Sequence, residues 1–99
     1  MYGLTAIEIE NIQSIFSTFE EVSEVIIYGP RAKGYYRNNS DIDLTIKGDN
    51  LDLSSMYRME EKLDDLMLPY KLNLSLVDKI ENKDLHAHIQ KRGLIFHKK

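Results

Sequence analysis

The residues with the clearest chemical potential lie between Gly29 and Asp43, where a glycine turn and basic residues precede two carboxylates. Asp41 and Asp43 are one residue apart in a segment that is typical of a strand. Side chains alternate between the two faces of a strand, so both carboxylates are predicted to share one face. Neighbouring like charges repel each other unless a cation lies between them. The pair therefore predicts a divalent cation, and magnesium is the first candidate because it prefers oxygen ligands.

The segment before the carboxylates predicts a phosphate site. Proline lacks an N–H and has a helix-compatible φ, so it favours a short helix over Pro30–Lys33. The free N–H groups and the dipole at a helix start favour phosphate. Arg31, Lys33 and Arg37 add positive charge for a polyphosphate. With the two carboxylates, these features predict a magnesium–nucleoside triphosphate site, which would orient phosphates and neutralise the charge that develops during transfer.

The elements that must position these groups follow from apolar spacing and turn residues. Thr5 to Glu8 fits a capping box at the start of the first helix. The other expected helices are Pro30–Lys33, one capped by Ser54 or Ser55 that runs to about Met67, and one capped by Asn82 that ends at Gly93 after Arg92. The expected strands are Glu24–Tyr28, Asp41–Ile46, Lys71–Val77 and a short final strand over Leu94–His97. The first of these is uninterrupted and β-branched, which predicts burial on both faces.

Composition limits the class of protein. The 99 residues suit a single domain, and the absence of cysteine excludes disulfides and thiolate zinc sites. The net charge of −3 argues against general nucleic-acid binding. The apolar runs are too short to span a membrane and no signal peptide is recognisable, so a cytoplasmic protein is expected. His86 and His88 are interpreted as surface histidines rather than metal ligands.

The ordered motif Gly29-Pro30, ten further residues and Asp41-Ile42-Asp43 resembles the signature of the polymerase beta-like nucleotidyltransferase superfamily. In that superfamily Gly-Ser is followed by a spacer and Asp-x-Asp. The local sequence is similar to the minimal nucleotidyltransferase (MNT) group of MntA-type antitoxins. Leu68–Ser75 and the closing Ile89…Gly93…Phe96 pattern extend the likeness over nearly the whole chain.

The resemblance implies an α+β nucleotidyltransferase fold for residues 1–99, with a short mixed sheet flanked by helices. It also implies transfer of a nucleoside monophosphate from ATP or another nucleoside triphosphate to a hydroxyl group, with two magnesium ions and three carboxylates. Many minimal members are antitoxins of a helical HEPN toxin, and some add AMP to a tyrosine of that toxin. A HEPN-type or other helical partner is therefore expected, and a homo-oligomer is left open.

The same resemblance implies roles for individual residues. Asp41 and Asp43 would bind magnesium and, with Asn73, would form the catalytic group. The implied nucleotide- and phosphate-binding residues are Gly29, Pro30, Arg31, Lys33 and Ser40.

Two positions depart from the family pattern. Pro30 replaces a serine whose hydroxyl contacts phosphate, so phosphate affinity should fall. Asn73 replaces the third carboxylate, and an amide cannot act as a base. Asp78 is not a convincing substitute because it lies on the opposite face. These departures favour a second hypothesis, a catalytically weak binding subunit that neutralises or regulates a partner. A third interpretation treats Asp41 and Asp43 as ordinary surface carboxylates, but it leaves their spacing from the glycine turn unexplained.

Overall fold

The computed structural model describes residues 1–99 and contains one four-stranded sheet with helices on both faces. In chain order the elements are α1 (Ala6–Ser17), β1 (Val22–Tyr28), α2 (Pro30–Lys33), β2 (Ile42–Gly48), α3 (Leu53–Asp64), β3 (Leu72–Leu76), the 3₁₀ turn η1 (Val77–Lys79), α4 (Lys83–Arg92) and β4 (Leu94–Lys98). The strand order is β3-β2-β1-β4, with β1 antiparallel to β2 and β4, and β2 parallel to β3. This mixed sheet confirms the α+β fold class.

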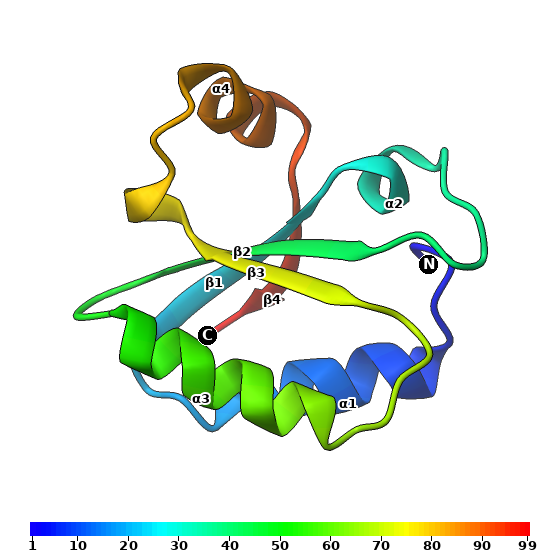
Figure 1. Cartoon of the computed structure of the whole chain (residues 1–99), viewed down its shortest axis with the longest axis horizontal. Coiled ribbons are helices and arrows are strands. Elements are labelled where there is room, and N and C mark those ends of the chain that lie inside the picture. Colours follow the sequence, from blue (N-terminus) through cyan, green and yellow to red (C-terminus); the bar gives the residue numbers. More distant parts are fainter.

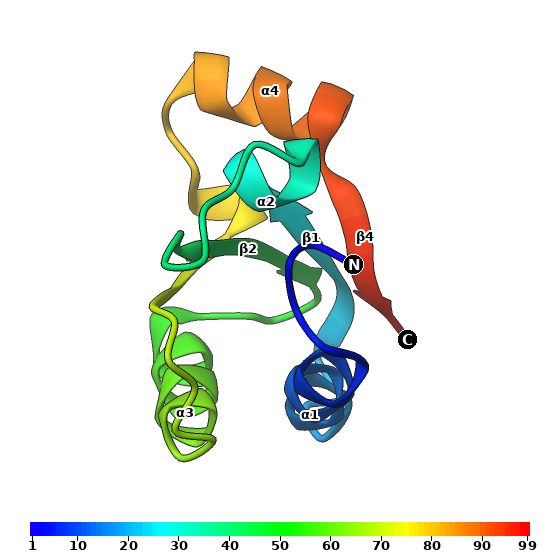
Figure 2. The same ribbon diagram turned by 90° about the vertical axis from the view of Figure 1, so that its right-hand side faces the viewer.

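The helices form two layers around the sheet. Figures 1 and 2 show α1 and α3 side by side under one face, with α4 and the short α2 on the other. Parallel strands cannot be joined by a tight turn, and α3 supplies the crossover from β2 to β3. A site beside α2 therefore lies on the face of the sheet that α2 and α4 cover.

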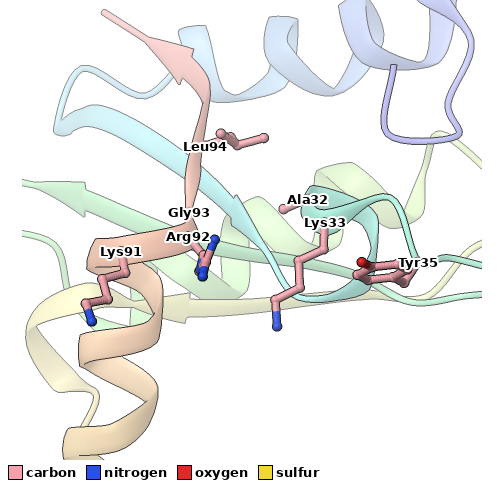
Figure 3. Close-up of a pocket in the computed structure, with 7 residues that line it drawn as sticks. All are labelled: Ala32, Lys33, Tyr35, Lys91, Arg92, Gly93 and Leu94. Carbon is pink, nitrogen blue, oxygen red and sulfur yellow. The ribbon is translucent and has the colours of Figure 1, made fainter.

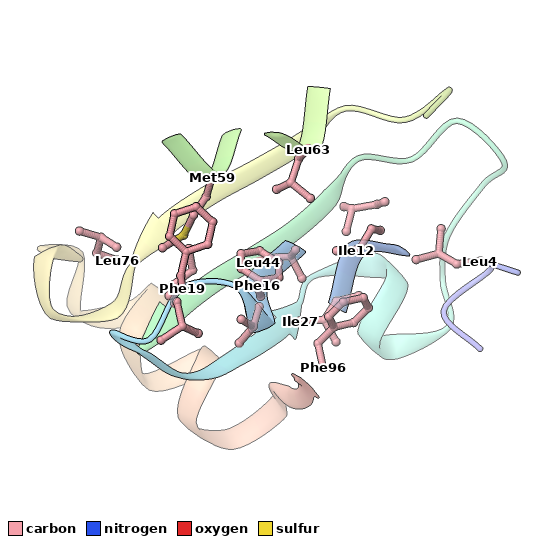
Figure 4. Packing of buried hydrophobic residues seen from close by; sticks show 14 residues of the cluster. Leu4, Ile12, Phe16, Phe19, Ile27, Leu44, Met59, Leu63, Leu76 and Phe96 are labelled. Carbon is pink, nitrogen blue, oxygen red and sulfur yellow. The ribbon is translucent and has the colours of Figure 1, made fainter. Parts of the chain in front are cut away.

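The hydrophobic core fills the space between the sheet and the α1–α3 layer (Figure 4). It contains Leu4, Ile12, Phe16, Phe19, Val22, Val25, Ile27, Ile42, Leu44, Ile46, Met59, Leu63, Leu76 and Phe96. In β1, Val25 and Ile27 are fully buried, whereas the alternate residues Ile26 and Tyr28 are only partly buried. The prediction that β1 is buried on both faces is therefore only half correct, because α2 and α4 cover the second face less completely.

The expected capping residue is present at α1, whereas the capping residue of α3 differs from the prediction. The capping box of Thr5 and Glu8 is present at α1. Asp52, not Ser54 or Ser55, caps α3, because its carboxylate accepts hydrogen bonds from the backbone N–H and the hydroxyl of Ser55 at 2.8 and 3.0 Å. A carboxylate at this position also interacts favourably with the helix dipole.

Helix ends differ more from the expectations. α3 ends at Asp64 rather than near Met67, which has a positive φ of 56° and an 86 % exposed side chain. α4 is capped by Asn82 and ends at Gly93 as predicted, but Gly93 is extended rather than left-handed. A Cβ at Gly93 would lie 2.5 Å from the carbonyl oxygen of Ile89 in α4 and 2.6 Å from Ile26 Cγ2 in β1, so close packing at the end of α4 explains this glycine.

The strands have the expected order and slightly different bounds. Asp41 lies just before β2 rather than inside it, and β2 continues to Gly48, which pairs with Val22. β3 is one residue shorter at each end than predicted, and β4 is one residue longer. None of the helices combines the length and apolar character needed to cross a membrane.

Candidate active site

The register of the sheet brings the two carboxylates and the asparagine together. Asp43 on β2 is the pairing partner of Asn73 on the parallel strand β3, and Asp41 lies immediately before β2. The Asn73 amide nitrogen donates to Asp41 Oδ2 at 3.1 Å and to Asp43 Oδ1 at 2.9 Å. One neutral donor thus stands between two carboxylates and offsets part of their repulsion.

This arrangement fits a single magnesium ion better than two. No group of three or more His, Cys, Asp or Glu side chains is placed to hold a metal ion. The Asn73 amide nevertheless shows that the space between Asp41 and Asp43 accepts an electropositive group. Rotation of the amide would present Asn73 Oδ1 instead, and a neutral carbonyl oxygen is an acceptable magnesium ligand. Two carboxylates and one amide oxygen could therefore hold one ion, with less negative charge than three carboxylates would provide.

Two features require a glycine at Gly29: its backbone conformation and a close contact with a neighbouring side chain. Its φ of 78° and ψ of −159° fall in a region that is essentially restricted to glycine. A Cβ at this position would lie 2.7 Å from Asp43 Oδ2, so any side chain would displace the carboxylate. The Gly29 turn and the carboxylate pair therefore form a single structural unit. This agrees with the short distance between them in the sequence.

The short helix after Gly29 forms as predicted. Pro30 is its first residue, and Gly34, at a φ of 85°, ends it by donating its N–H to the Pro30 carbonyl. Pro30 thus preserves the shape of the turn, while it supplies neither the hydroxyl nor the N–H of a serine at this position.

Arg31 does not face a ligand space, in contrast to the expected position near the phosphates. It is only 2 % exposed. Its guanidinium donates to the carbonyl of Ser40 at 2.8 and 3.0 Å, to that of Asn38 at 3.3 Å and to that of Tyr2 at 2.9 Å. These bonds occupy all three nitrogens of the fork, so Arg31 fixes the loop that leads to Asp41.

Two aromatic rings complete the surroundings of Arg31. The guanidinium carbon lies 5.5 Å from the centroid of the Tyr36 ring and 4.7 Å from that of Tyr70. Tyr70 directly precedes the segment that enters β3, the strand of Asn73. Arg31 therefore connects the N-terminal segment, the loop before Asp41 and the entry to β3. The sequence contained no signal for this, because a buried arginine and a phosphate-binding arginine have the same residue type.

Ser40 also serves the loop. Its hydroxyl oxygen accepts a hydrogen bond from the backbone N–H of Arg37 at 2.8 Å, and its carbonyl receives the Arg31 guanidinium. The expected contact of Ser40 with a nucleotide would require the hydroxyl to donate while it keeps this bond. Lys33 and Arg37, by contrast, are exposed and leave their charges open to solvent.

Tyr28 joins the site although the sequence did not single it out. It is the last residue of β1 and pairs with Asp43 across the sheet. Burial raises the pKa of Tyr28 above its ordinary value of 10.0; the nearby Ser75 hydroxyl works against this rise and the Asp43 carboxylate adds to it. Tyr28 is therefore a neutral hydroxyl beside the carboxylate pair at physiological pH. Its position directly before Gly29 was the signal that could have identified it.

A mixed sheet that places paired carboxylates against a glycine turn and a short helix agrees with the resemblance to nucleotidyltransferases. Residues 10–99 match the family model described as "Polymerase beta, Nucleotidyltransferase". The chain belongs to this family. No curated protein sequence is significantly similar to it.

Solved structures of toxin–antitoxin complexes share this fold. A chain of a toxin–antitoxin structure with AMP-PNP is 17 % identical, with a TM-score of 0.71 over 94 % of this chain and 73 % of that one. A chain of an MntA–HepT complex is 15 % identical, with a TM-score of 0.69 over 93 % and 71 %. A chain of a complex between a tri-AMPylated Shewanella oneidensis HEPN toxin and an MNT antitoxin is 13 % identical, with a TM-score of 0.67 over 91 % of this chain and 69 % of that one. At these identities the likeness establishes the fold alone.

Proposed function

We propose that this chain is a minimal nucleotidyltransferase that binds magnesium–ATP and transfers AMP to a hydroxyl group of a HEPN-type partner protein. The observation that carries the proposal is the joint placement of Asp41, Asp43 and Asn73 beside the Gly29 turn. The similarity in fold to complexes with AMP-PNP and with an AMPylated HEPN toxin favours ATP and this kind of partner.

In this proposal the acceptor oxygen attacks the α-phosphorus of ATP, a new P–O bond forms, and the bond to pyrophosphate breaks. The acceptor loses a proton, and Asn73 cannot take it because a neutral amide is not a base. Asp41 and Asp43 are the only carboxylates of the group and are both assigned to magnesium, so the proton passes to solvent water. Bound magnesium would neutralise phosphate charge, with these two carboxylates and the Asn73 carbonyl as its protein ligands.

The test is a labelling experiment with the purified chain, magnesium, ATP labelled at the α-phosphate and a purified HEPN-type protein. We expect label on the partner, and we expect Asp43→Ala to lower it on the order of a hundredfold. Asp49→Ala is the matched control, because Asp49 is an exposed carboxylate in the turn after β2. An unlabelled partner, or equal labelling by the Asp43→Ala variant, would refute the transfer.

A second candidate function is a regulatory subunit that keeps the fold and binds the partner without catalysis. Two observations favour it: Asn73 already donates a hydrogen bond to each carboxylate, and Pro30 lacks the hydroxyl and the N–H that a serine would supply to the phosphate turn. This candidate predicts that the double variant Asp41→Asn/Asp43→Asn still binds and neutralises the partner. Loss of neutralisation with retained binding would instead assign the effect to AMP transfer.

A further inference from the structure

A separate cavity of about 530 Å³ lies between α2 and the junction of α4 with β4. It is lined by Ala32, Lys33, Tyr35, Lys91, Arg92, Gly93 and Leu94. Figure 3 shows Lys33 and Arg92 on facing sides of this space, with Lys91 farther along α4 and the Tyr35 ring beyond Lys33. The lining thus combines residues that are almost sixty positions apart in the chain, which the sequence did not bring together.

Charge is the distinctive property of this cavity. Lys33, Lys91 and Arg92 are three cations from two helices, and no acidic residue contributes to the lining. Basic residues at helix C-termini interact favourably with the dipole, and Lys91 and Arg92 lie in the last turn of α4. Each helix end, however, carries only about half a negative charge, so two ends cannot balance three cations. The lining therefore carries a net positive charge, although the chain has a net charge of −3.

The cavity is distinct from the carboxylate group. In the strand order β3-β2-β1-β4, Asp43 and Asn73 belong to the strands on one side of β1, whereas the cavity borders β4 on the other side. The one-turn helix α2 stands between the two places, with Gly29 at the carboxylates and Lys33 in the cavity.

Three features indicate the class of ligand. The volume falls in the range of small-molecule pockets. A planar arginine fork and two lysines suit phosphate groups, which accept several charge-assisted hydrogen bonds. The Tyr35 side chain is 83 % exposed and offers an aromatic surface beside them. The negative net charge disfavours a long nucleic acid, so the ligand should be small.

We infer that this cavity binds a small ligand that carries several phosphate groups. Two sources share this chemistry: the terminal phosphates of a nucleotide held at the carboxylates, and a separate phosphorylated molecule. The first source rests on the proposed nucleotide site and the second does not, and neither requires AMP transfer.

The first experiment measures binding of inorganic tripolyphosphate by calorimetry, with a chelator present to remove metal ions and at physiological ionic strength. We expect measurable binding that becomes at least tenfold weaker in the double variant Lys91→Gln/Arg92→Gln. Both residues are exposed, so the variant should fold normally. Lys83→Gln/Lys98→Gln is the matched control, since it removes two exposed cations outside the cavity and should change the affinity less than twofold. Absence of binding, or equal weakening by both variants, would overturn the inference.

A second experiment distinguishes the two sources. If tripolyphosphate and magnesium–ATP compete, the cavity receives the terminal phosphates of the nucleotide; if they bind together, it receives a separate ligand. The Asp43→Asn variant keeps the two proposals apart, because it should lose magnesium–ATP while it retains tripolyphosphate. A failure of AMP transfer with intact tripolyphosphate binding would therefore refute the proposed function alone.

Discussion

Arg31 and the Asp41–Asp43 pair belong to the same stretch of chain, but their charges differ in burial and in hydrogen-bond partners. The Arg31 guanidinium is buried, donates to three backbone carbonyls and lies over two aromatic rings. The two carboxylates are exposed or half-buried and share one neutral amide donor. The fold supplies hydrogen-bond acceptors for all three nitrogens of the Arg31 guanidinium, whereas the two carboxylates receive only one shared donor.

This difference separates the groups that build the site from those that can bind. A buried arginine with satisfied hydrogen bonds fixes loops, because breaking any of its bonds leaves a carbonyl or a charge without a partner. An incompletely balanced carboxylate pair keeps an affinity for cations. The substitutions below test this division through the free energy of unfolding, from the largest expected change to the smallest.

Arg31→Ala should cause the largest loss, roughly 3–5 kcal/mol of unfolding free energy, since it removes several charge-assisted bonds of a buried side chain and leaves three backbone carbonyls without this donor. Chemical denaturation monitored by circular dichroism measures this. Arg31→Lys should recover only part of the loss, because an ammonium cannot reproduce the planar fork. A loss below about 1 kcal/mol would mean that Arg31 is not a structural centre.

Gly29→Ala should cost about 2 kcal/mol, because alanine is strained at a φ of 78° and its Cβ would meet Asp43 Oδ2. The same variant should bind magnesium–ATP more weakly, since the Asp43 carboxylate must move. Gly34→Ala is the control: Gly34 also has a positive φ, but a Cβ there meets no atom within 4 Å. It should lose stability through backbone strain while nucleotide binding is retained. Equal loss of nucleotide binding in both variants would contradict a role of Gly29 in placing Asp43.

Asp41→Asn should change the unfolding free energy by no more than about 0.5 kcal/mol when magnesium is absent. The carboxylate is exposed, and its replacement removes repulsion from Asp43 while an acceptor for Asn73 remains. The same denaturation assay provides the measurement. A loss as large as that of Arg31→Ala would show that both charges are equally structural.

The smallest change concerns Tyr28 and is confined to high pH. Its pKa is raised in the folded state, so below pH 10 the phenol is neutral in both states and its contribution to stability is complete. Above pH 10 the unfolded chain loses this proton first, and stability falls as the pH rises toward the folded pKa. Tyr28→Phe lacks this contribution, so its unfolding free energy should decrease less steeply above pH 10. Parallel curves for the two proteins would contradict the raised pKa.

The sequence predicted the fold well because its local signals agreed with the tertiary packing. Capping residues, the Pro30–Gly34 helix and apolar spacing located the helices and strands to within a few residues. The least accurate end was that of α3, where Met67 fits the apolar stripe but lies beyond the last helical turn with a positive φ. Such an end depends on backbone geometry that residue type does not encode.

The candidate site could be predicted only in part. Asp41, Asp43 and Asn73 were found because strand periodicity and the family motif define their positions. The burial of Arg31 was missed, since only the folded loop reveals the carbonyls that receive its guanidinium. The cavity of Lys33, Lys91 and Arg92 was missed because it depends on how α4 packs beside α2. Long-range juxtapositions of this kind have no local sequence signal.

The most direct test of the magnesium–nucleotide site is the affinity for magnesium–ATP of the original chain and of Asn73→Asp, measured by calorimetry. The third carboxylate should replace the neutral amide beside Asp43 and raise the affinity about tenfold, which corresponds to ~1.4 kcal/mol. In the absence of magnesium the same variant should be less stable than the original chain, because three carboxylates then repel each other. An unchanged affinity would contradict the assignment of Asp41, Asp43 and residue 73 as one metal-binding group.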